Sequence, residues 1–531
     1  MRKRMLVIML VLTLMFVGVT GRLSFLMLGE NMLAAASAQT SKTVTVTLPR
    51  GTVYDCNMVP LTNAQTRTLA VIPPSVDAVA AVTEQLSGQA AQAALESLQS
   101  GNPVLVEVPS DFLCADAEIY TVPVRYSENQ IAAHVIGYLD GEGRAVTGIE
   151  YAYDSLLGGK EPLKVTYTVD AVGRPLSGVE PTVVGTPRAR GGVVLTLDSR
   201  VQRIVERVAS QTIEKGAVIV MESDTGRLLA CCSLPTYSPY SVSEVLNDAS
   251  APLVNRVLSS YNIGSVFKIC VAAAALKGGT TTMFTSNCTG ETPIGSNLFH
   301  CHLLTGHGAL GMPEALAKSC NCYFIDLGIN TGAEAIYDMC VRMGFNRAYS
   351  LARSLTATAG TLPSLTELKT RPAALANLSF GQGDLMMTPL HVATMVAAVA
   401  NGGYLVTPSI VEGTTDGEKI DRLEPAEPLR VLSQQQAELL RQMMCSVVEQ
   451  GTGKAAKPEQ YGAGGKTATA ETGWVVDSKL IKQAWFAGFY PEDSGKYTIV
   501  VLRENGEGGA VDCAPVFKKI ADAMAQAGLV G

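Results

Sequence analysis

The sequence predicts a membrane-anchored chain of the mixed α/β class (α+β type), with a mostly β domain followed by a larger domain of strands and helices. Three observations lead to this prediction. An apolar run follows the N-terminus, and the 531 residues exceed what one hydrophobic core usually supports. Near residue 185, irregular strand-like segments give way to longer strands followed by amphipathic helices. The net charge of -7 gives no indication of nucleic-acid binding.

The N-terminus predicts a transmembrane anchor. Basic residues precede an apolar run over residues 5–28, which is interrupted only by Arg22. About 20 residues span a bilayer, and the flanking positive charge predicts a cytoplasmic tail of residues 1–4 with the rest of the chain outside the cytoplasm. A cleaved signal peptide is the alternative, because Ala36-Ser37-Ala38 resembles a cleavage site. That site lies well beyond the apolar core, which favours an uncleaved anchor.

Two domains are expected after the anchor. Residues 42–184 contain alternating, strand-like segments such as "TVTVTLP" and one helical segment, "GQAAQAALESLQS". Residues 185–531 contain longer strands and amphipathic helices. In this second domain we expect a hairpin turning at residues 224–226, paired strands in "AWFAGFYP" and "YTIVVLREN", and a closing helix in "APVFKKIADAMAQAG".

A charged lysine lies inside the apolar run "NIGSVFKICVAAAAL", residues 262–276, whose Ala and Leu content predicts a helix. Positions three apart share a helix face, so Ser265 and Lys268 can meet as a nucleophile and its base. A lysine base must be neutral, which apolar surroundings favour. The alternative is a lysine whose stem covers apolar surface while its amine reaches water.

Two more motifs follow in order. Ser265 to Lys268 is the only Ser-x-x-Lys in the chain, and this motif accompanies Ser-x-Asn and Lys-Thr-Gly in penicillin-binding proteins and class A β-lactamases. Three of the four Ser-x-Asn matches lie in the other domain or too close to Ser265 to form a separate wall of a cleft. Ser319-Cys320-Asn321 remains, and Lys466-Thr467-Ala468 precedes strand-forming sequence.

With these motifs the chain resembles a class B penicillin-binding protein, a membrane-anchored peptidoglycan DD-transpeptidase. Further segments fit in the family's order: "RGTVYD", "HVIGYL", "TGIEYAYDSLLGG", "LTLDSRVQ", "LPTYSP", "SFGQGDLMMTPL" and "YTIVVLRENGEGG". The resemblance implies a pedestal over residues 42–184 and a serine transpeptidase domain over residues 185–531, with a central antiparallel sheet flanked by helices.

The resemblance also implies roles for the motif residues. Ser265 would be acylated by the penultimate D-Ala of a stem peptide, with release of the terminal D-Ala, and Lys268 would take the serine proton. Ser319 would relay that proton to the leaving amine. Asn321 would bond the substrate backbone.

The third motif would hold the substrate's carboxylate. Lys466 would raise the local positive potential, while Thr467 and Thr469 would bind the carboxylate. The backbone N–H groups of Ser265 and Thr469 would form the oxyanion hole.

Two positions depart from the family pattern. Ile263 replaces the usual proline before the nucleophile, and Ala468 replaces the glycine of Lys-Thr-Gly. Because strand side chains alternate, we expect the Ala468 methyl to point away from the substrate if Thr467 and Thr469 point toward it.

Two other stretches have some features of binding sites. "GGKT" at 464–467 lacks the first glycine of a P-loop, because position 460 is Gln, so nucleotide binding is rejected. Cys288, Cys301, His302 and His307 have no standard zinc-finger spacing, which favours a Cys288–Cys301 disulfide or a packed thiol pair over zinc. The sequence thus indicates no cofactor and no metal.

The leading functional hypothesis is a transpeptidase that acts on stem peptides of peptidoglycan and its lipid-linked precursors, is inhibited by β-lactam antibiotics, and has a membrane glycan polymerase of the shape, division or sporulation type as its partner. The alternatives are a DD-carboxypeptidase or β-lactamase-type hydrolase, and a β-lactam sensor or scaffold without turnover. The pedestal argues against a hydrolase, and the complete set of catalytic side chains argues against a scaffold.

Overall fold

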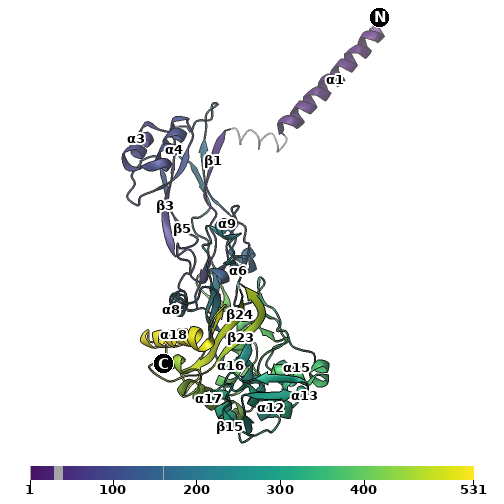
Figure 1. The fold of residues 1–531 in the computed structure, drawn as a ribbon. Helices are drawn as coiled ribbons and strands as arrows, with labels where there is room; N and C mark the ends of the chain where they lie inside the picture. The colour runs from purple at the N-terminus through teal and green to yellow at the C-terminus, as the bar shows by residue number, and fades with distance from the viewer. Residues whose placement is uncertain (1, 29–39, 160, 177, 477, 531) are drawn as a thin grey trace. The chain divides into compact units, whose positions relative to one another are not determined.

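A computed structural model describes residues 2–28, 40–159, 161–176, 178–476 and 478–530. Among these residues a single helix is long and apolar enough to cross a membrane: α1 (Arg2–Leu28), whose stretch Lys3–Phe25 has a mean hydropathy of 2.2 (Figure 1). This helix is compatible with the predicted anchor. The candidate cleavage site at 36–38 lies outside the described residues.

The chain divides into two compact units, and each unit is built from separate stretches of sequence. The first comprises Met1–Gly51, Asn63–Arg125 and Gly158–Arg190, and the second comprises Thr52–Thr62, Tyr126–Leu157 and Gly191–Gly531. The domain limits proposed from the sequence, 42–184 and 185–531, stay a prediction.

The first unit is rich in strands. One antiparallel sheet has the order β4-β3-β5, and helices α3 and α4 bury alanine, valine and leucine side chains against it. A second antiparallel sheet has the order β1-β6-β7. The bounds are β1 (Ser41–Thr47), β3 (Gln65–Ile72), α3 (Val76–Gln85), α4 (Gly88–Gln99), β4 (Val104–Val108), β5 (Glu118–Val124), β6 (Leu163–Thr168) and β7 (Thr182–Val184). The strand predicted at "TVTVTLP" and the helix predicted at "GQAAQAALESLQS" are confirmed.

The second unit is built on a five-stranded antiparallel sheet with the order β10-β9-β25-β24-β23. Its strands are β9 (Gly216–Glu222), β10 (Leu228–Leu234), β23 (Gly464–Val476), β24 (Lys479–Tyr490) and β25 (Tyr497–Glu504). The predicted hairpin is the β9–β10 pair, and the two strands predicted near the C-terminus are β24 and β25. The predicted central antiparallel sheet is therefore confirmed.

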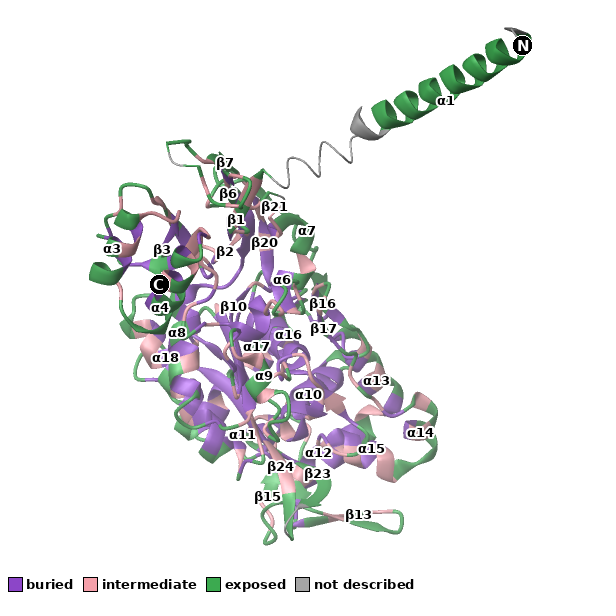
Figure 2. Cartoon of the chain, turned by 90° about the horizontal axis from the view of Figure 1, so that it is seen from above, coloured by how far each residue is buried: buried purple, intermediate pink, exposed green. Residues whose placement is uncertain are grey.

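Helices cover both faces of this sheet. Along β9, Val218 and Val220 pack with helices α8 (Ser199–Ala209) and α18 (Ala514–Gln526), while Ile219 belongs to the core cluster of the opposite face. That face carries α10 (Lys268–Lys277), α16 (Pro389–Ala400) and α17 (Gln434–Glu449). Every residue of α16 is buried, as the purple ribbon in Figure 2 shows. The alternation along the strands thus supplies two apolar layers.

Shorter elements complete the second unit. A four-stranded sheet has the order β2-β8-β20-β21. The bounds are β2 (Thr52–Tyr54), α5 (Ala133–Ile136), α6 (Gly148–Ala152), α7 (Asp154–Leu157), β8 (Gly192–Leu195), α9 (Val242–Val245), β11 (Tyr261–Asn262), β12 (Ser286–Cys288), β13 (Glu291–Ile294), β14 (Asn297–His300), β15 (Gly308–Leu310), α11 (Met312–Ala317), α12 (Asn321–Thr331), α13 (Ala333–Arg342), β16 (Tyr349–Ala352), β17 (Leu355–Ala357), α14 (Leu365–Thr370), α15 (Pro372–Ser379), β18 (Met386–Met387), β19 (Tyr404–Leu405), β20 (Val411–Thr415), β21 (Ile420–Arg422) and β22 (Leu429–Arg430).

Candidate active site

Ser265 lies in a tight turn between β11 and α10. The turn is a 3-10 helix, η1 (Gly264–Phe267), so the prediction of one α-helix from residue 262 is wrong at its start. Gly264 has φ +61°, and a Cβ there would lie 3.0 Å from the Ala470 Cβ, so glycine is needed at this close approach. Ile263, at the position where the resemblance leads one to expect proline, is fully buried with φ −89°.

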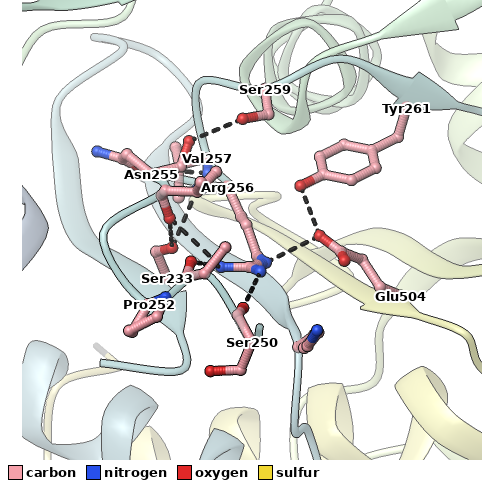
Figure 3. Close-up of polar contacts among 12 residues, drawn as sticks. Ser233, Ser250, Pro252, Asn255, Arg256, Val257, Ser259, Tyr261 and Glu504 are labelled. Atoms are coloured by element: carbon pink, nitrogen blue, oxygen red, sulfur yellow. Dashed lines mark hydrogen bonds and ion pairs between the residues drawn. The ribbon is translucent and has the colours of Figure 1, made fainter. Parts of the chain in front are cut away.

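An ion pair with a buried arginine, together with a hydrogen bond from β11, connects the segment before the nucleophile to the central sheet (Figure 3). Arg256, 4% exposed at its side chain, donates to Glu504 Oε1 at 2.8 Å and to the Ser250 carbonyl at 2.8 Å. Tyr261 in β11 donates its hydroxyl to the same Glu504 oxygen at 2.8 Å. These contacts connect the strand before the nucleophile to the end of β25, and sequence reasoning did not identify them.

Lys268 is fully buried at the start of α10, and its amine points to the Ser-x-Asn motif. The Nζ donates to the Ser319 carbonyl at 2.7 Å, to Ser319 Oγ at 3.2 Å and to Asn321 Oδ1 at 2.8 Å. Among the described residues no hydrogen bond joins it to Ser265 Oγ, so the predicted direct contact is not formed in this structure. Burial lowers the pKa of Lys268 to about 7, although the nearby thiols, Cys320 first, act in the opposite direction.

Ser319 connects the second motif to the third. Its Oγ accepts a hydrogen bond from Lys466 Nζ at 2.9 Å in addition to the one from Lys268. Burial, and then the charge of Lys268, holds the pKa of Lys466 well below its usual value. Ser319 has φ +53°, a left-handed conformation that is uncommon for a serine and recurs at functional sites. Two buried amines therefore share one hydroxyl group, which disfavours charge on both at once.

Strand β23 carries the remaining predicted residues. Thr467 Oγ1 lies 2.8 Å from Thr452 Oγ1, and Thr469 is exposed and accepts a hydrogen bond from the Gly509 N–H at 3.3 Å. Ala468 is 3% exposed, and its Cβ lies 3.3 Å from where a Cβ on Gly264 would be. The methyl thus faces the turn of the nucleophile, and Ala468 also lines the cleft, so the expectation that its methyl points away from the substrate stays a prediction. Thr452 was missed because it lies outside every motif.

The predicted side chains surround one cleft of about 1060 Å³. Five of them line it, while Lys268 and Lys466 lie buried beside it. The lining residues include Ser265, His300, Cys301, Ser319, Asn321, Asn377, Gln382, Asp384, Thr452, Thr467, Thr469 and Lys482. The structure thus brings together all seven predicted residues, although they span more than two hundred positions of the chain.

Of the two predicted alternatives for Cys288 and Cys301, the structure shows packed thiols rather than a disulfide. All twelve cysteines are described, and all are free thiols, so the structure contains no Cys288–Cys301 disulfide. Those two thiols instead lie together with His307 and with Cys320, the middle residue of the Ser-x-Asn motif. Cys320 was not among the candidate ligands predicted from the sequence, because helix α11 separates it from Cys288, Cys301 and His307.

Comparison with known proteins is consistent with this geometry. Residues 216–522 match the family model of the penicillin-binding protein transpeptidase domain. The chain is 28% identical to the stage V sporulation protein D of Bacillus subtilis over 98% of this chain and 85% of that protein. It is 31% identical to the peptidoglycan D,D-transpeptidase PbpA of Mycobacterium tuberculosis over 63% of this chain and 73% of that protein.

The fold also matches solved structures. One of them, described as showing structural coordination of polymerization and crosslinking by a peptidoglycan synthase complex, superposes with a TM-score of 0.70 over 98% of each chain. Its sequence identity to this chain is 24%, so it supports the fold alone.

Proposed function

Because the chain belongs to the penicillin-binding protein transpeptidase family, we propose that it is a serine-type D-Ala-D-Ala transpeptidase that cross-links peptidoglycan stem peptides. The observation that carries this proposal is the placement of Ser319 Oγ within hydrogen-bond distance of two buried lysine amines, in a cleft that Ser265 also lines. A hydroxyl between two amines of lowered pKa is suited to moving a proton in either direction.

Acylation begins at Ser265. Its Oγ attacks the carbonyl carbon of the penultimate D-Ala, and the proton passes to Lys268, whose pKa of about 7 leaves a large neutral fraction near neutral pH. The backbone N–H groups of Ser265 and Thr469 stabilise the oxyanion. When the peptide bond breaks, Ser319 delivers the proton to the departing amine, and the terminal D-Ala leaves with its nitrogen neutralised.

The substrate is held by the opposite walls of the cleft. Thr467 and Thr469 bind its terminal carboxylate through their hydroxyl groups. Asn321 bonds the substrate backbone with its side-chain amide. In the second half-reaction the amine of a neighbouring stem peptide attacks the ester carbonyl, gives up its proton through the same relay, and releases Ser265 with a new peptide bond.

The anchor fits this role. Positive charge at residues 2–4, the first turn of helix α1, supports a cytoplasmic N-terminus and an extracytoplasmic catalytic unit, where peptidoglycan lies. We also propose a membrane glycan polymerase as its partner, since the anchor would place both enzymes in the same membrane and a transpeptidase needs glycan strands to cross-link.

Covalent trapping by a penicillin tests the proposal. The full-length protein in detergent should gain the mass of one penicillin, and Ser265→Ala should abolish the gain while leaving the melting temperature nearly unchanged. Ser260→Ala is the matched control, because this nearby serine bonds Thr358 and does not line the cleft. Labelling that survives in Ser265→Ala, or that is lost in Ser260→Ala, would contradict the assignment.

A further inference from the structure

The segment between α10 and α11 lacks an apolar core of its own. It contains two short antiparallel pairs, β12 with β15 and β13 with β14. Of residues 281–310, which are all described, only Cys288, Gly290, Cys301 and Leu310 are buried. Small segments that bury so little apolar surface usually depend on a disulfide or a metal ion for their order. Two of these four buried residues carry thiols.

Four ligand-forming side chains converge at this point. The ligand atoms of Cys288, Cys301, His307 and Cys320 all lie within 4.8 Å of one another. His307 Nδ1 lies 3.6 Å from Cys288 Sγ and 3.5 Å from Cys301 Sγ, and Cys301 Sγ lies 3.9 Å from Cys320 Sγ.

The three separations that involve Cys301 or His307 and a neighbouring thiol match those of a tetrahedral zinc site. Zn–S bonds of about 2.3 Å and Zn–N bonds of about 2.0–2.1 Å at tetrahedral angles place sulfur about 3.5 Å from nitrogen and sulfur about 3.8 Å from sulfur. Packing of neutral thiols alone gives no reason for one imidazole nitrogen to approach two of them equally closely. A disulfide would join two sulfurs and leave the other two groups without a role.

We propose that Cys288, Cys301, His307 and Cys320 bind one structural zinc ion. On binding, each thiol releases its proton to solvent, and three thiolates with one neutral imidazole complete the coordination of the ion. All four positions are occupied by protein, so the zinc is structural rather than a catalytic Lewis acid. Three of the ligands come from the 281–310 segment and the fourth from the residue before α12, so the ion joins that segment to the Ser-x-Asn motif.

The zinc also positions catalytic groups, a consequence that rests on the proposed function. Cys320 lies between Ser319 and Asn321, so fixing its sulfur restrains the backbone from which both side chains project. Asn321 Nδ2 in turn donates to the His300 carbonyl at 3.2 Å, directly before the ligand Cys301. Loss of the ion should therefore misplace the groups that contact Lys268.

The metal content of the full-length protein in detergent tests the site. We expect about one zinc ion per chain. After replacement of zinc by Co²⁺, we expect the intense visible absorption and near-ultraviolet thiolate band of tetrahedral cobalt. Cys288→Ser, at a ligand that does not line the cleft, should lower the zinc content or zinc affinity at least about tenfold, whereas Cys114→Ser, in the other compact unit, should leave it unchanged.

Measuring penicillin acylation together with zinc content distinguishes a failure of the zinc site from a failure of the proposed function. Removing zinc with a chelator should lower both the melting temperature and the rate of penicillin acylation, the latter at least about tenfold, and added Zn²⁺ should restore both. Protein that acylates at Ser265 yet holds no zinc, or in which mass spectrometry finds a Cys288–Cys301 disulfide, would overturn the zinc site and leave the transpeptidase intact. Zinc-loaded protein that fails to acylate would count against the proposed function alone.

Discussion

Lys268 and Lys466 are fully buried, and both approach the same serine hydroxyl. A buried ammonium costs free energy unless it is well solvated by hydrogen bonds, so burial favours the neutral amine in each case. The difference between the two lies in their partners. Lys268 has three acceptors from Ser319 and Asn321, whereas Lys466 has Ser319 Oγ and the Thr467 carbonyl. We therefore expect the single proton to reside mainly on Lys268 when the site is charged.

The lowered pKa of Lys268 predicts a pH profile. Its pKa falls from 10.5 to about 7 through burial, so the amine is neutral above that pH and charged below it. The second-order rate of penicillin acylation should rise about tenfold per pH unit below pH 7 and level off above it. Lys268→Arg, whose guanidinium stays charged, should be slower by about 10²–10⁴-fold. A flat wild-type profile from pH 5 to 9 would show that the proton goes to another group.

Ala468→Gly tests the orientation of strand β23. The methyl is buried against the turn at Gly264, and glycine adds freedom to the unfolded chain, so the substitution should lower the free energy of unfolding by roughly 0.5–1 kcal/mol. Acylation by penicillin should change little, because the methyl packs against the turn at Gly264 and the strand keeps its position without it. A severalfold faster acylation without loss of stability, measured on the same preparation, would mean that the methyl obstructs the cleft.

The sequence predicted the residues of the site wherever a motif fixes both the residue types and their order. Ser265, Ser319 and Lys466 were found in this way. Arg256 was not, because it lies outside every segment that carries the resemblance and its partner Glu504 lies 248 positions away. Cys320 was read only as the variable position of Ser-x-Asn, since nothing in local sequence indicates that its thiol lies 3.9 Å from Cys301.

The contacts of Glu504 with Arg256 and Tyr261, which connect the segment before the nucleophile to β25, should stabilise the second unit. Glu504→Gln leaves the buried guanidinium of Arg256 without its counter-charge, so we expect a loss of about 3 kcal/mol in the free energy of unfolding by denaturant. Tyr261→Phe removes one hydrogen bond and keeps the ion pair, so it should cost about 1 kcal/mol. Equal losses in the two variants would contradict the dominant role assigned to the ion pair.

Secondary structure was predictable where local chemistry dominates. The β9–β10 hairpin follows from its turn residues, and β24, β25 and α18 follow from long, regular apolar patterns. The 3-10 turn η1 was read as α-helix because 3-10 turns are frequent at helix ends and this one runs directly into α10. The short strands over residues 286–310 were missed because little apolar burial defines them.

The division of the chain into compact units depends on contacts that sequence does not display. The second unit takes in Thr52–Thr62 and Tyr126–Leu157 as well as everything from Gly191 onward. The pattern of strands and helices in the sequence changes at only one boundary, near residue 185. Short N-terminal segments that belong to the second unit, such as β2, are too small to alter the local composition. The apolar helix α1, by contrast, was predictable from length and hydropathy alone.

Product analysis with a natural substrate tests the central claim most directly. The full-length protein in detergent, supplied with lipid-linked precursor and a glycan polymerase, should release D-Ala and form cross-linked stem-peptide dimers, detected by mass spectrometry after digestion of the glycan. Ser265→Ala should form none, and Ser260→Ala should match the wild type. Release of D-Ala with only uncross-linked tetrapeptides would identify a carboxypeptidase, and dimers formed by Ser265→Ala would contradict the assignment of the nucleophile.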